Sequence, residues 1–542
     1  MGYYGSMQRR VSARSRLILT AIALSIAAIG TRALSHPGET SDGNGLETPT
    51  RTPGEDQPRV PANRHQGSLL AFDVTDAATG LPIPCKLTFV GIEGTPRPVF
   101  THNDIGRPEG ELAISAFDRV FSAAGSEEIR VPHGTYDIYV SRGPEWDVSI
   151  HRKVVMGSEG AKITAKLRHV VDTSGWLSAD FHVHAAPSPD SIVPLGHRIL
   201  EFVADGIDMI VSTDHNVVTD YAPTIRQLGL GALITSARGD ELTTNGWGHY
   251  GAFPLPQDTA RAGQGAILVH GHNAREIFAN VREHAPEAII NVHHPRIDPG
   301  VGYFIVGEFD PHSDRAGRAG FSFNFDALEV LNGYQDPLRK SVDRTIDDWL
   351  GLLNHGHIVT ATGNSDTHHL TYNMGGYPRN YVRVRDDRPG KVTPGEVAAS
   401  VKNHQAFFTT GPFVRFRSGK GDMGDLVPAP GGKATLDIQV DAAPWISVSR
   451  VILYVSGKEA KRWAVPESQE VVRFHVRHDI TLPSSAVDGY AVVRVDGDKI
   501  LAPVVGDNRT FAVYPLALTN PIFFDVNGNS RYDPEHAHGP HD

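Results

Sequence analysis

The sequence predicts a multidomain fold of the α/β plus β class, in which a central α/β barrel is flanked by N-terminal and C-terminal β-sandwiches. The chain has 542 residues, which at about 150 residues per domain allows three to four domains. Short runs of alternating polar and apolar residues occupy residues 67–170 and again 416–542, as in antiparallel sandwiches. Between them, over residues 171–415, strand-like runs alternate with helical stretches, which is typical of βα units.

Composition and charge place the chain among ordinary globular proteins. Hydrophobic residues make up 40% of it and charged residues 21%, so neither a disordered polyanion nor a membrane bundle is expected. The 51 basic and 62 acidic side chains leave a net charge of -11, so no nucleic acid partner is expected, nor a stable membrane partner. The single cysteine, Cys85, excludes an internal disulfide and a thiolate zinc site.

The N-terminus has the pattern of an export signal. Four arginines precede an apolar run over residues 17–30, which is too short to span a bilayer at about 20 residues. Small residues at Ala33 and Ser35 favour cleavage there, so residues 1–35 are predicted to be the signal peptide of a periplasmic or extracellular protein. An uncleaved N-terminal anchor is the alternative. Residues 36–66 are rich in Pro, Gly and polar residues and are predicted to be a disordered linker.

The two outer segments are expected to be β-sandwiches. In residues 67–170 the runs LLAFDV, CKLTFV, YDIYV and KITAKL are separated by turn signals. The stretches DVTDAATGLPIPCKLTF and VPHGTYDIYVSRG resemble transthyretin-like or carboxypeptidase-regulatory-like domains. Residues 416–542 show the same alternation in ATLDIQV, RVILYV and YAVVRV. Near their end, Asp525 opens the run DVNGN, for which an Asx-rich turn is favoured over a calcium loop because His536 stands at position 12.

One βαβ unit of the central segment is legible in the sequence. FHVHA is expected to be a strand, and SIVPLGHRILEFVAD places apolar residues at helical spacing. Gly206 ends this helix, and IDMIVST forms the next strand. His182 and His184 lie two residues apart on the first strand, so both imidazoles face the same side and converge on one point.

Histidine is concentrated in this central segment, where 15 of the 27 histidines lie between His182 and His369. Imidazole and carboxylate groups together suit Zn, Mn or Fe. Further candidates stand at predicted strand ends: His215 in TDH, Glu241 and His249 in GDE with GH, His293 and His294 in HHPR, and Asp366 and His368 in NSDTH. His270, His272, His284 and His312 are expected to be surface residues.

The roles of Asp190, of Asp214 and of the adjacent pair His293 and His294 need separate consideration. Asp190 lies in a Pro- and Ser-rich loop that can fold back over the site, or it is a helix N-terminal residue that favours the macrodipole. Asp214 is expected to orient its neighbours rather than to bind metal. Adjacent His293 and His294 face opposite sides if the strand continues to that point, so only one of them is expected to bind.

The ordered series HVH, TDH, GDE with GH, HHPR and GNSDTH resembles the PHP (polymerase and histidinol phosphatase) metallohydrolase domain over residues 175–415. The stretches GWLSADFHVHA, GDELTTNGWGHY, LEVLNGY and GYPRNYV are similar to its CehA/McbA branch. The resemblance implies a distorted (β/α)7 barrel that holds two to three divalent ions (Zn, Mn or Fe). The ligands it implies are His182, His184, Asp190, His215, Glu241, His249, His294, Asp366 and His368. Asp190 stands in SPDS where the family often has SDG.

The same resemblance implies an exported hydrolase that cleaves phosphoester, or carboxyl or carbamate ester, bonds of a small molecule. Clustered cations lower the pKa of a bound water towards ~7, so a metal-activated hydroxide is the expected nucleophile. The leaving group is expected to be protonated by a site histidine, for which His368 is the candidate, or by another metal-bound water, and the sequence does not choose between them. Arg296 and Arg379 are candidates for binding an anionic substrate, because guanidinium groups match phosphate and carboxylate geometry.

Two alternative functions stay open. An amidohydrolase-type barrel also begins with HxH, although GDE with GH and the paired DxH argue against it. A degenerate, non-catalytic barrel that binds carbohydrate or cell-wall polymer would carry the same motifs without turnover.

Overall fold

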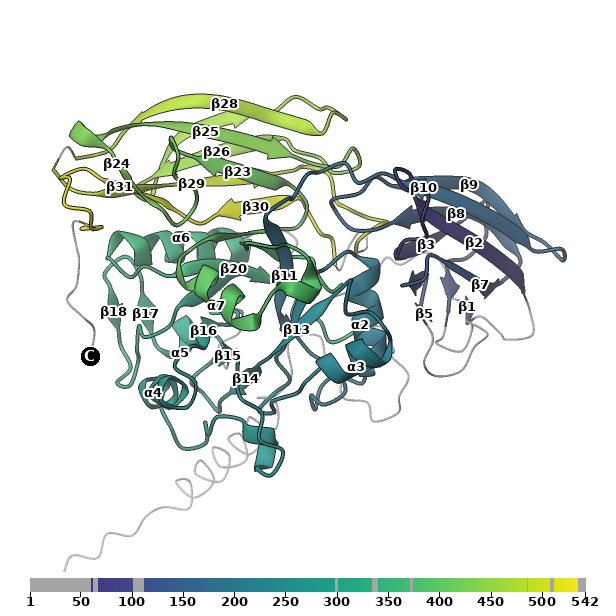
Figure 1. Ribbon diagram of the computed structural model, residues 1–542, viewed down its shortest axis with the longest axis horizontal. Coiled ribbons are helices and arrows are strands. Elements are labelled where there is room, and N and C mark those ends of the chain that lie inside the picture. The colour runs from purple at the N-terminus through teal and green to yellow at the C-terminus, as the bar shows by residue number, and fades with distance from the viewer. Residues whose placement is uncertain are drawn as a thin grey trace, which may run out of the picture. The chain divides into compact units, whose positions relative to one another are not determined.

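The computed structural model describes residues 60–61, 67–100, 112–297, 301–333, 340–370, 374–484, 486–506 and 511–534. They form a mostly β structure with 40% of residues in strands and 15% in helices, distributed over several sheets (Figure 1). The predicted signal peptide and, apart from Val60–Pro61, the predicted linker lie outside the described residues. In the described part of the chain, no helix is long and apolar enough to cross a membrane.

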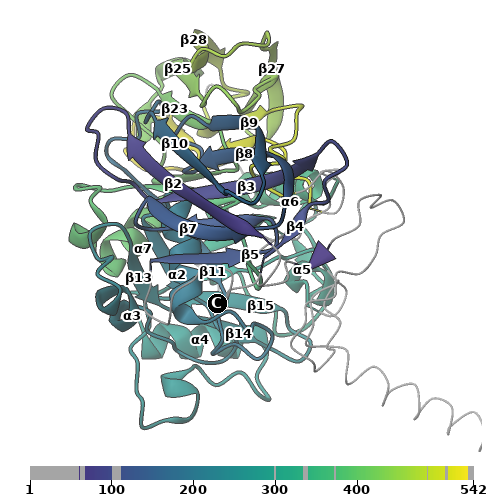
Figure 2. The same ribbon diagram turned by 90° about the vertical axis from the view of Figure 1, so that its right-hand side faces the viewer.

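The N-terminal segment forms two sheets, as the alternating pattern predicts. Its first sheet has the order β10-β2-β7, with β2 (Ser68–Asp76), β7 (Ser126–Val131) and β10 (Ala161–Leu167). The second has the order β5-β6-β3-β8-β9, with β3 (Cys85–Ile92), β5 (Ala113–Ala116), β6 (Arg119–Ser122), β8 (Gly134–Ser141) and β9 (Ser149–Met156). A small pair joins β1 (Val60–Pro61) to β4 (Pro98–Val99). Figure 2 shows the strands of both sheets.

The core of this segment lies between the two sheets. Phe72 and Val74 of β2 pack in one buried cluster with Leu87 and Phe89 of β3. Alternate residues of a strand point to opposite faces, so each sheet contributes one apolar face to this cluster. Cys85 is buried in the same cluster, and burial raises the pKa of its thiol to about 12.

The predicted βαβ unit is confirmed. Strand β11 (Trp176–Val183) is followed by α2 (Leu195–Ala204), and β12 (Met209–Ser212) returns parallel to β11. Gly206 ends the helix with a φ of 66°, in the left-handed region that favours glycine. Strand β13 (Thr235–Arg238) continues the sheet in parallel beyond β12, after the short helix α3 (Ala222–Gln227).

A second central sheet has the order β14-β15-β16-β19-β20. Its strands are β14 (Asp240–Thr243), β15 (His249–Phe253), β16 (Ile289–Val292), β19 (Ala327–Asn332) and β20 (Thr360–Asn364). Single bridges join it to the first sheet on both sides, from His215 to Glu241 and from Val183 to Thr367. The bridges bring the ends of β11, β12, β14 and β20 close together.

A regular (β/α)7 arrangement is not shown, because the described helices are few and β14 and β15 form an antiparallel pair. The remaining central helices are α4 (Ala274–His284), α5 (Tyr303–Val306), α6 (Lys340–Asn354) and α7 (Pro394–Lys402). Helix α4 begins with a capping box between Asn273 and Glu276, and α7 with Pro394 after the N-cap Thr393. Short β17 (Phe309–Asp310) and β18 (Arg315–Ala316) form a hairpin, and the 3-10 turns are η1 (Ala262–Gly265), η2 (Pro389–Lys391) and η3 (Pro430–Gly432).

The central and C-terminal segments share one continuous sheet, which the sequence did not predict. Strand β11 pairs with β21 (Arg379–Arg383), β21 with β22 (Ala406–Thr409), and β22 with β30 (Leu516–Thr519). The sheet then continues through β29 (Gly489–Asp496) to β26 (Arg450–Val455) and β27 (Lys458–Ala464), with β24 (Leu426–Pro428) and β31 (Ile522–Asp525) at its side. A smaller sheet consists of β23 (Phe413–Arg417), β25 (Lys433–Asp441) and β28 (Val472–Thr481).

The Asx-rich turn expected at Asp525 is confirmed. Its Oδ1 accepts a hydrogen bond from the Gly528 amide at 2.6 Å, and its Oδ2 accepts one from the Ser530 amide at 2.9 Å. These bonds satisfy backbone donors of the turn locally, as Asx side chains commonly do.

Candidate metal centre

The histidine and carboxylate motifs of the central segment converge in one buried cluster. They come from the ends of six strands or the residues just beyond them: His182 and His184 from β11, His215 after β12, Glu241 and His249 from β14 and β15, His293 and His294 after β16, and Asp366 and His368 after β20. Each of these side chains is buried, with His215 the most exposed at 9%. The cluster therefore includes every ligand position that the resemblance implies on these strands.

Glu241 lies at the centre of this cluster. It belongs to strand β14 and is completely buried. Six imidazole nitrogens lie within 3.5 Å of its two oxygens: Nε2 of His182 at 3.1 Å, Nε2 of His184 at 3.5 Å, Nδ1 of His215 at 2.9 Å, Nδ1 of His249 at 3.3 Å, Nδ1 of His293 at 3.0 Å and Nε2 of His294 at 3.3 Å. Two of the groups of side chains that could hold a metal ion include Glu241.

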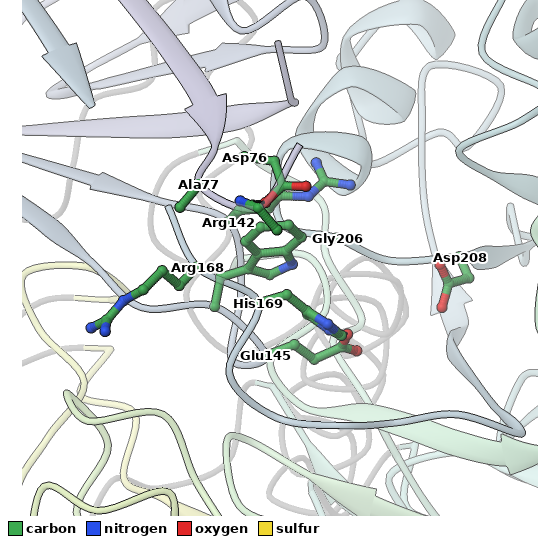
Figure 3. Close-up of a pocket in the computed structure, with 10 residues that line it drawn as sticks. Asp76, Ala77, Arg142, Glu145, Arg168, His169, Gly206 and Asp208 are labelled. Carbon is green, nitrogen blue, oxygen red and sulfur yellow. Dashed lines mark hydrogen bonds and ion pairs between the residues drawn. The ribbon is translucent and has the colours of Figure 1, made fainter. Parts of the chain in front are cut away.

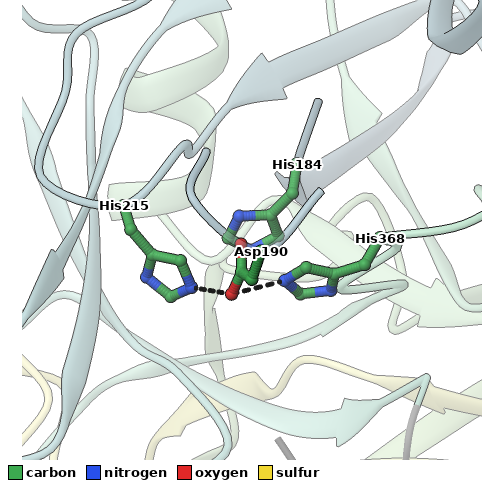
Figure 4. Close-up of side chains that lie close together, drawn as sticks. All are labelled: His184, Asp190, His215 and His368. Atoms are coloured by element: carbon green, nitrogen blue, oxygen red, sulfur yellow. Dashed lines mark hydrogen bonds and ion pairs between the residues drawn. The ribbon is translucent and has the colours of Figure 1, made fainter. Parts of the chain in front are cut away.

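A second carboxylate, Asp190, reaches the cluster from the loop between β11 and α2. Its Oδ2 lies 2.7 Å from Nε2 of His215 and 3.2 Å from Nε2 of His368. Figure 4 shows this carboxylate between the two imidazoles, with His184 in the same group. The Pro- and Ser-rich loop therefore does fold back over the site, and Asp190 lies outside α2, which starts at Leu195.

A third carboxylate, Asp366, follows β20. Its Oδ1 lies 3.1 Å from Nε2 of His182 and 3.2 Å from Nε2 of His184. Asp214, expected to orient its neighbours, accepts a hydrogen bond from the Ala185 amide at 2.9 Å and so holds the chain just beyond His184.

Burial and neighbouring charges shift the pKa values of the carboxyl and imidazole groups in the cluster. Burial alone raises the pKa of the Glu241 carboxyl, but the neighbouring His182, His215 and His249 bring it well below its usual value. Burial lowers the pKa of His182, and the carboxylates of Asp366, Glu241 and Glu329 outweigh it and raise that pKa well above normal. In His184, burial and the neighbouring His368 hold the pKa well below normal.

The residues fit divalent metal ions. Five overlapping groups of three or four side chains bring ligand atoms within 4.8 Å of one another, and together they include all nine implied ligands. Nε2 of His182, Nε2 of His184 and Oε2 of Glu241 are buried and make no hydrogen bond within the described part of the chain. Buried polar atoms without hydrogen bonds are costly, and metal coordination supplies the missing partner.

The condition under which His293 and His294 would face opposite sides, a strand that continues to them, is not met. Strand β16 ends at Val292, and His294 has a φ of 27°, so the alternation of a strand does not extend to these residues. Both rings reach Oε1 of Glu241, and His293 also stacks on His182 with ring centroids 3.6 Å apart. Burial and the neighbouring His182 lower the pKa of His293 to about 3.

Arg296 and Arg379, the candidates for binding an anionic substrate, both make hydrogen bonds within the protein. The Arg296 guanidinium donates to Asp348 at 2.7 and 3.2 Å and to the Phe309 carbonyl at 3.1 Å. Arg379 is 1% exposed, and it donates to the carbonyls of Gly376, Asp205 and Gly206. Both guanidinium groups therefore have protein partners in the fold, and substrate binding by them stays a prediction.

Sequence reasoning missed Glu329 on β19. This side chain is completely buried, and its Oε2 lies 2.9 Å from Nδ1 of His182. Burial raises the pKa of its carboxyl to about 7. The signal was present in LEVLNGY as an acidic residue inside a buried strand, where an unpaired charge is unfavourable.

The four histidines expected at the surface lie away from this cluster. His270, His284 and His312 are exposed and His272 is half-buried. None of them belongs to a candidate metal group in the described residues.

A separate pocket of about 770 Å³ lies where the N-terminal segment meets the residues after α2. Figure 3 shows Glu145, His169 and Asp208 among the residues that line it. Glu145 is held by His169 at 2.9 Å and by the Tyr381 hydroxyl at 2.8 Å. None of the predicted site residues lines this pocket.

Comparison with known proteins assigns no family. No family model matches the chain, and no curated protein matches it. Solved structures that match include the CARDB domain of a Pyrococcus furiosus protein, determined in solution by NMR and, in complex with di-metal ions, in a crystal. Both are 17% identical and cover 21% and 20% of this chain and 95% and 91% of their own, with TM-scores of 0.15 and 0.14. Likeness at this level carries no conclusion about fold or function.

Proposed function

We propose that this chain is a metal-dependent hydrolase of the PHP type that cleaves ester bonds of a small molecule. The observation that carries the proposal is Glu241, a buried carboxylate with six imidazole nitrogens within 3.5 Å. Asp190 and Asp366 lie against some of the same rings, and each ring that is neutral offers a lone pair to a metal ion. Two to three divalent ions (Zn, Mn or Fe) shared among these residues and Asp190, Asp366 and His368 satisfy that arrangement.

The strand order also supports a barrel of the PHP type. Strands β11, β12, β14, β15, β16, β19 and β20 follow one another through ladder pairs and the two single bridges. The proposed ligands lie where these strands end, as active sites of βα barrels do.

The residues of the chain have distinct parts in the proposed reaction. Divalent ions, when bound, lower the pKa of water and neutralise charge on a substrate oxygen. His368 donates from Nδ1 to the Asp366 carbonyl at 2.9 Å, which leaves Nε2 on the side of Asp190. A neutral His368 of this tautomer offers its Nε2 lone pair, which favours a ligand over the alternative role of proton donor.

Metal analysis and hydrolysis assays test the proposal together. Purified protein is expected to contain two to three divalent ions and to hydrolyse p-nitrophenyl phosphate, bis-p-nitrophenyl phosphate or naphthyl carbamate, and a chelator is expected to abolish this activity. His182→Ala is expected to lose metal and activity together, whereas the exposed control His284→Ala retains both. Folded protein that binds no metal, or that binds metal and hydrolyses none of these esters, overturns the proposal.

The same assays separate the alternatives. Hydrolysis of a cyclic amide without hydrolysis of any ester favours an amidohydrolase. Binding of a polysaccharide without turnover of any substrate favours the non-catalytic barrel. Export remains a prediction from residues 1–35, and the processed N-terminus of the secreted protein tests it.

A further inference from the structure

We propose that Glu329 and Asn332 form a buried pair that positions two of the proposed metal ligands, His182 and Asp366. This inference rests on the proposed function and deepens it. Glu329 and Asn332 are at most 1% exposed, and both belong to β19.

An irregularity in β19 brings these two residues to the same side. Residues three apart in a regular strand point to opposite faces. The register between β19 and β20 shifts between Glu329 and Leu331, so that Glu329 pairs with Thr362 and Asn332 with Asn364. A bulge of this kind adds one residue and redirects the side chains that follow it. Nδ2 of Asn332 consequently donates to Oε1 of Glu329 at 2.5 Å.

Each member of the pair holds one proposed ligand. Oε2 of Glu329 lies 2.9 Å from Nδ1 of His182. Nδ2 of Asn332 also donates to Oδ2 of Asp366 at 3.0 Å. The pair therefore links His182 on β11 to Asp366 after β20 through β19.

The hydrogen bond to Glu329 selects the tautomer of His182. A carboxylate accepts, so the hydrogen of a neutral imidazole stays on Nδ1 and the lone pair stays on Nε2. Nε2 lies 3.1 Å from Oε1 of Glu241 and 3.1 Å from Oδ1 of Asp366. The amide of Asn332 holds Oδ2 of Asp366 in the same way and leaves Oδ1 facing the histidines. Removing a carboxylate that bonds the far nitrogen of a ligating histidine typically weakens metal affinity about 10- to 100-fold.

Metal titration of variants tests the positioning role. Competition with a chelator is expected to show Zn²⁺ affinity weakened about 10- to 100-fold in Glu329→Ala, with an unchanged number of ions. Glu329→Gln, which can still accept from Nδ1, is expected to recover part of the affinity. Asn332→Ala is expected to weaken affinity as well, since it releases both carboxylates. The absorption spectrum of the Co²⁺-loaded protein is expected to shift in Glu329→Ala, because the orientation of His182 changes.

Asp348→Asn is the matched control, since Asp348 is a buried acid whose partner is Arg296. It is expected to lower stability and leave metal affinity unchanged. Unchanged affinity in Glu329→Ala and Asn332→Ala overturns the inference. Loss of one whole ion in Glu329→Ala also overturns it, because Glu329 then binds metal directly with His182 and His293. Titration of the wild-type chain separates this result from failure of the proposed function, which shows as no metal binding at all.

Discussion

The Asp190 carboxylate lies 2.7 Å from Nε2 of His215, across 25 residues of sequence. Ser188 holds the loop that makes this contact possible. Its hydroxyl donates to Oδ1 of Asp190 at 2.8 Å and accepts from the His215 amide at 3.2 Å. The departure from the SDG pattern of the family therefore still delivers a carboxylate to the cluster.

Asp190→Asn is expected to weaken binding of one metal ion about tenfold or more, because the amide keeps the shape of the side chain and removes its charge. Isothermal titration with Zn²⁺ or Mn²⁺ measures the change. The control is Asp310→Asn, an exposed acid outside the cluster, which is expected to titrate like wild type. Identical titrations of Asp190→Asn and wild type would show that Asp190 is no ligand.

Lys86→Ala is expected to lower the free energy of unfolding by about 3–5 kcal/mol, since it leaves a buried carboxylate without its partner. Nζ of Lys86 lies 2.7 and 2.8 Å from the two oxygens of Asp205, and both side chains are completely buried. The pair links β3 of the N-terminal sandwich to the residue that caps α2.

Urea unfolding measures this loss, with Lys153→Ala as the control. Lys153 pairs with Glu93 on the surface, and its loss is expected to leave stability unchanged within error. If Lys86→Ala unfolds at the same urea concentration as the control, the buried pair does not stabilise the junction.

Arg296→Ala is expected to destabilise the protein by about 3–5 kcal/mol, since Asp348 is then buried without a partner. A double variant, Arg296→Met with Asp348→Leu, removes both charges and is expected to recover most of that stability. If Arg296 holds the substrate anion as the sequence predicts, the double variant raises the KM of the proposed hydrolase for p-nitrophenyl phosphate at full stability. A KM within about twofold of wild type would contradict that prediction.

Gly251→Ala is expected to cost about 1–3 kcal/mol and to weaken metal binding. A Cβ at this position overlaps Nε2 of His293, a ring that is buried and stacked on His182 and so has little room to move. The control is Gly157→Ala, where a Cβ meets nothing within 4 Å. Thermal unfolding with and without Zn²⁺ compares the two variants, and equal behaviour would contradict the close approach at His293.

The sequence alone predicted the features that depend on local pattern. Strands with a period of two, such as β2 and β10, are legible because one face of each is buried. The helix that ends before Gly206 is legible because its apolar residues recur at helical spacing and glycine stops it. His182 and His184 face the same side because side chains two residues apart on a strand point in the same direction.

Only the tertiary structure decided which of these side chains meet. Glu241, Asp190 and Asp366 approach the histidines across tens to more than a hundred residues, a relationship that no periodicity records. Local pattern also did not show that β16 ends before His294, or that Asp348 is the partner of Arg296.

Glu329 is the clearest case of a contact that the local sequence pattern does not record. In the sequence it is one acidic residue in an apolar run, and a bulge in β19 turns it and Asn332 to the same side, where each contacts one proposed ligand. The continuous sheet through β22 and β30 is a similar case, since strand pairing between distant segments depends on backbone hydrogen bonds rather than on side-chain pattern. The sequence by itself determined which residues can ligate and which faces are buried. The tertiary structure decided which of them share a site, because strand ends distant in the chain are brought together only by folding.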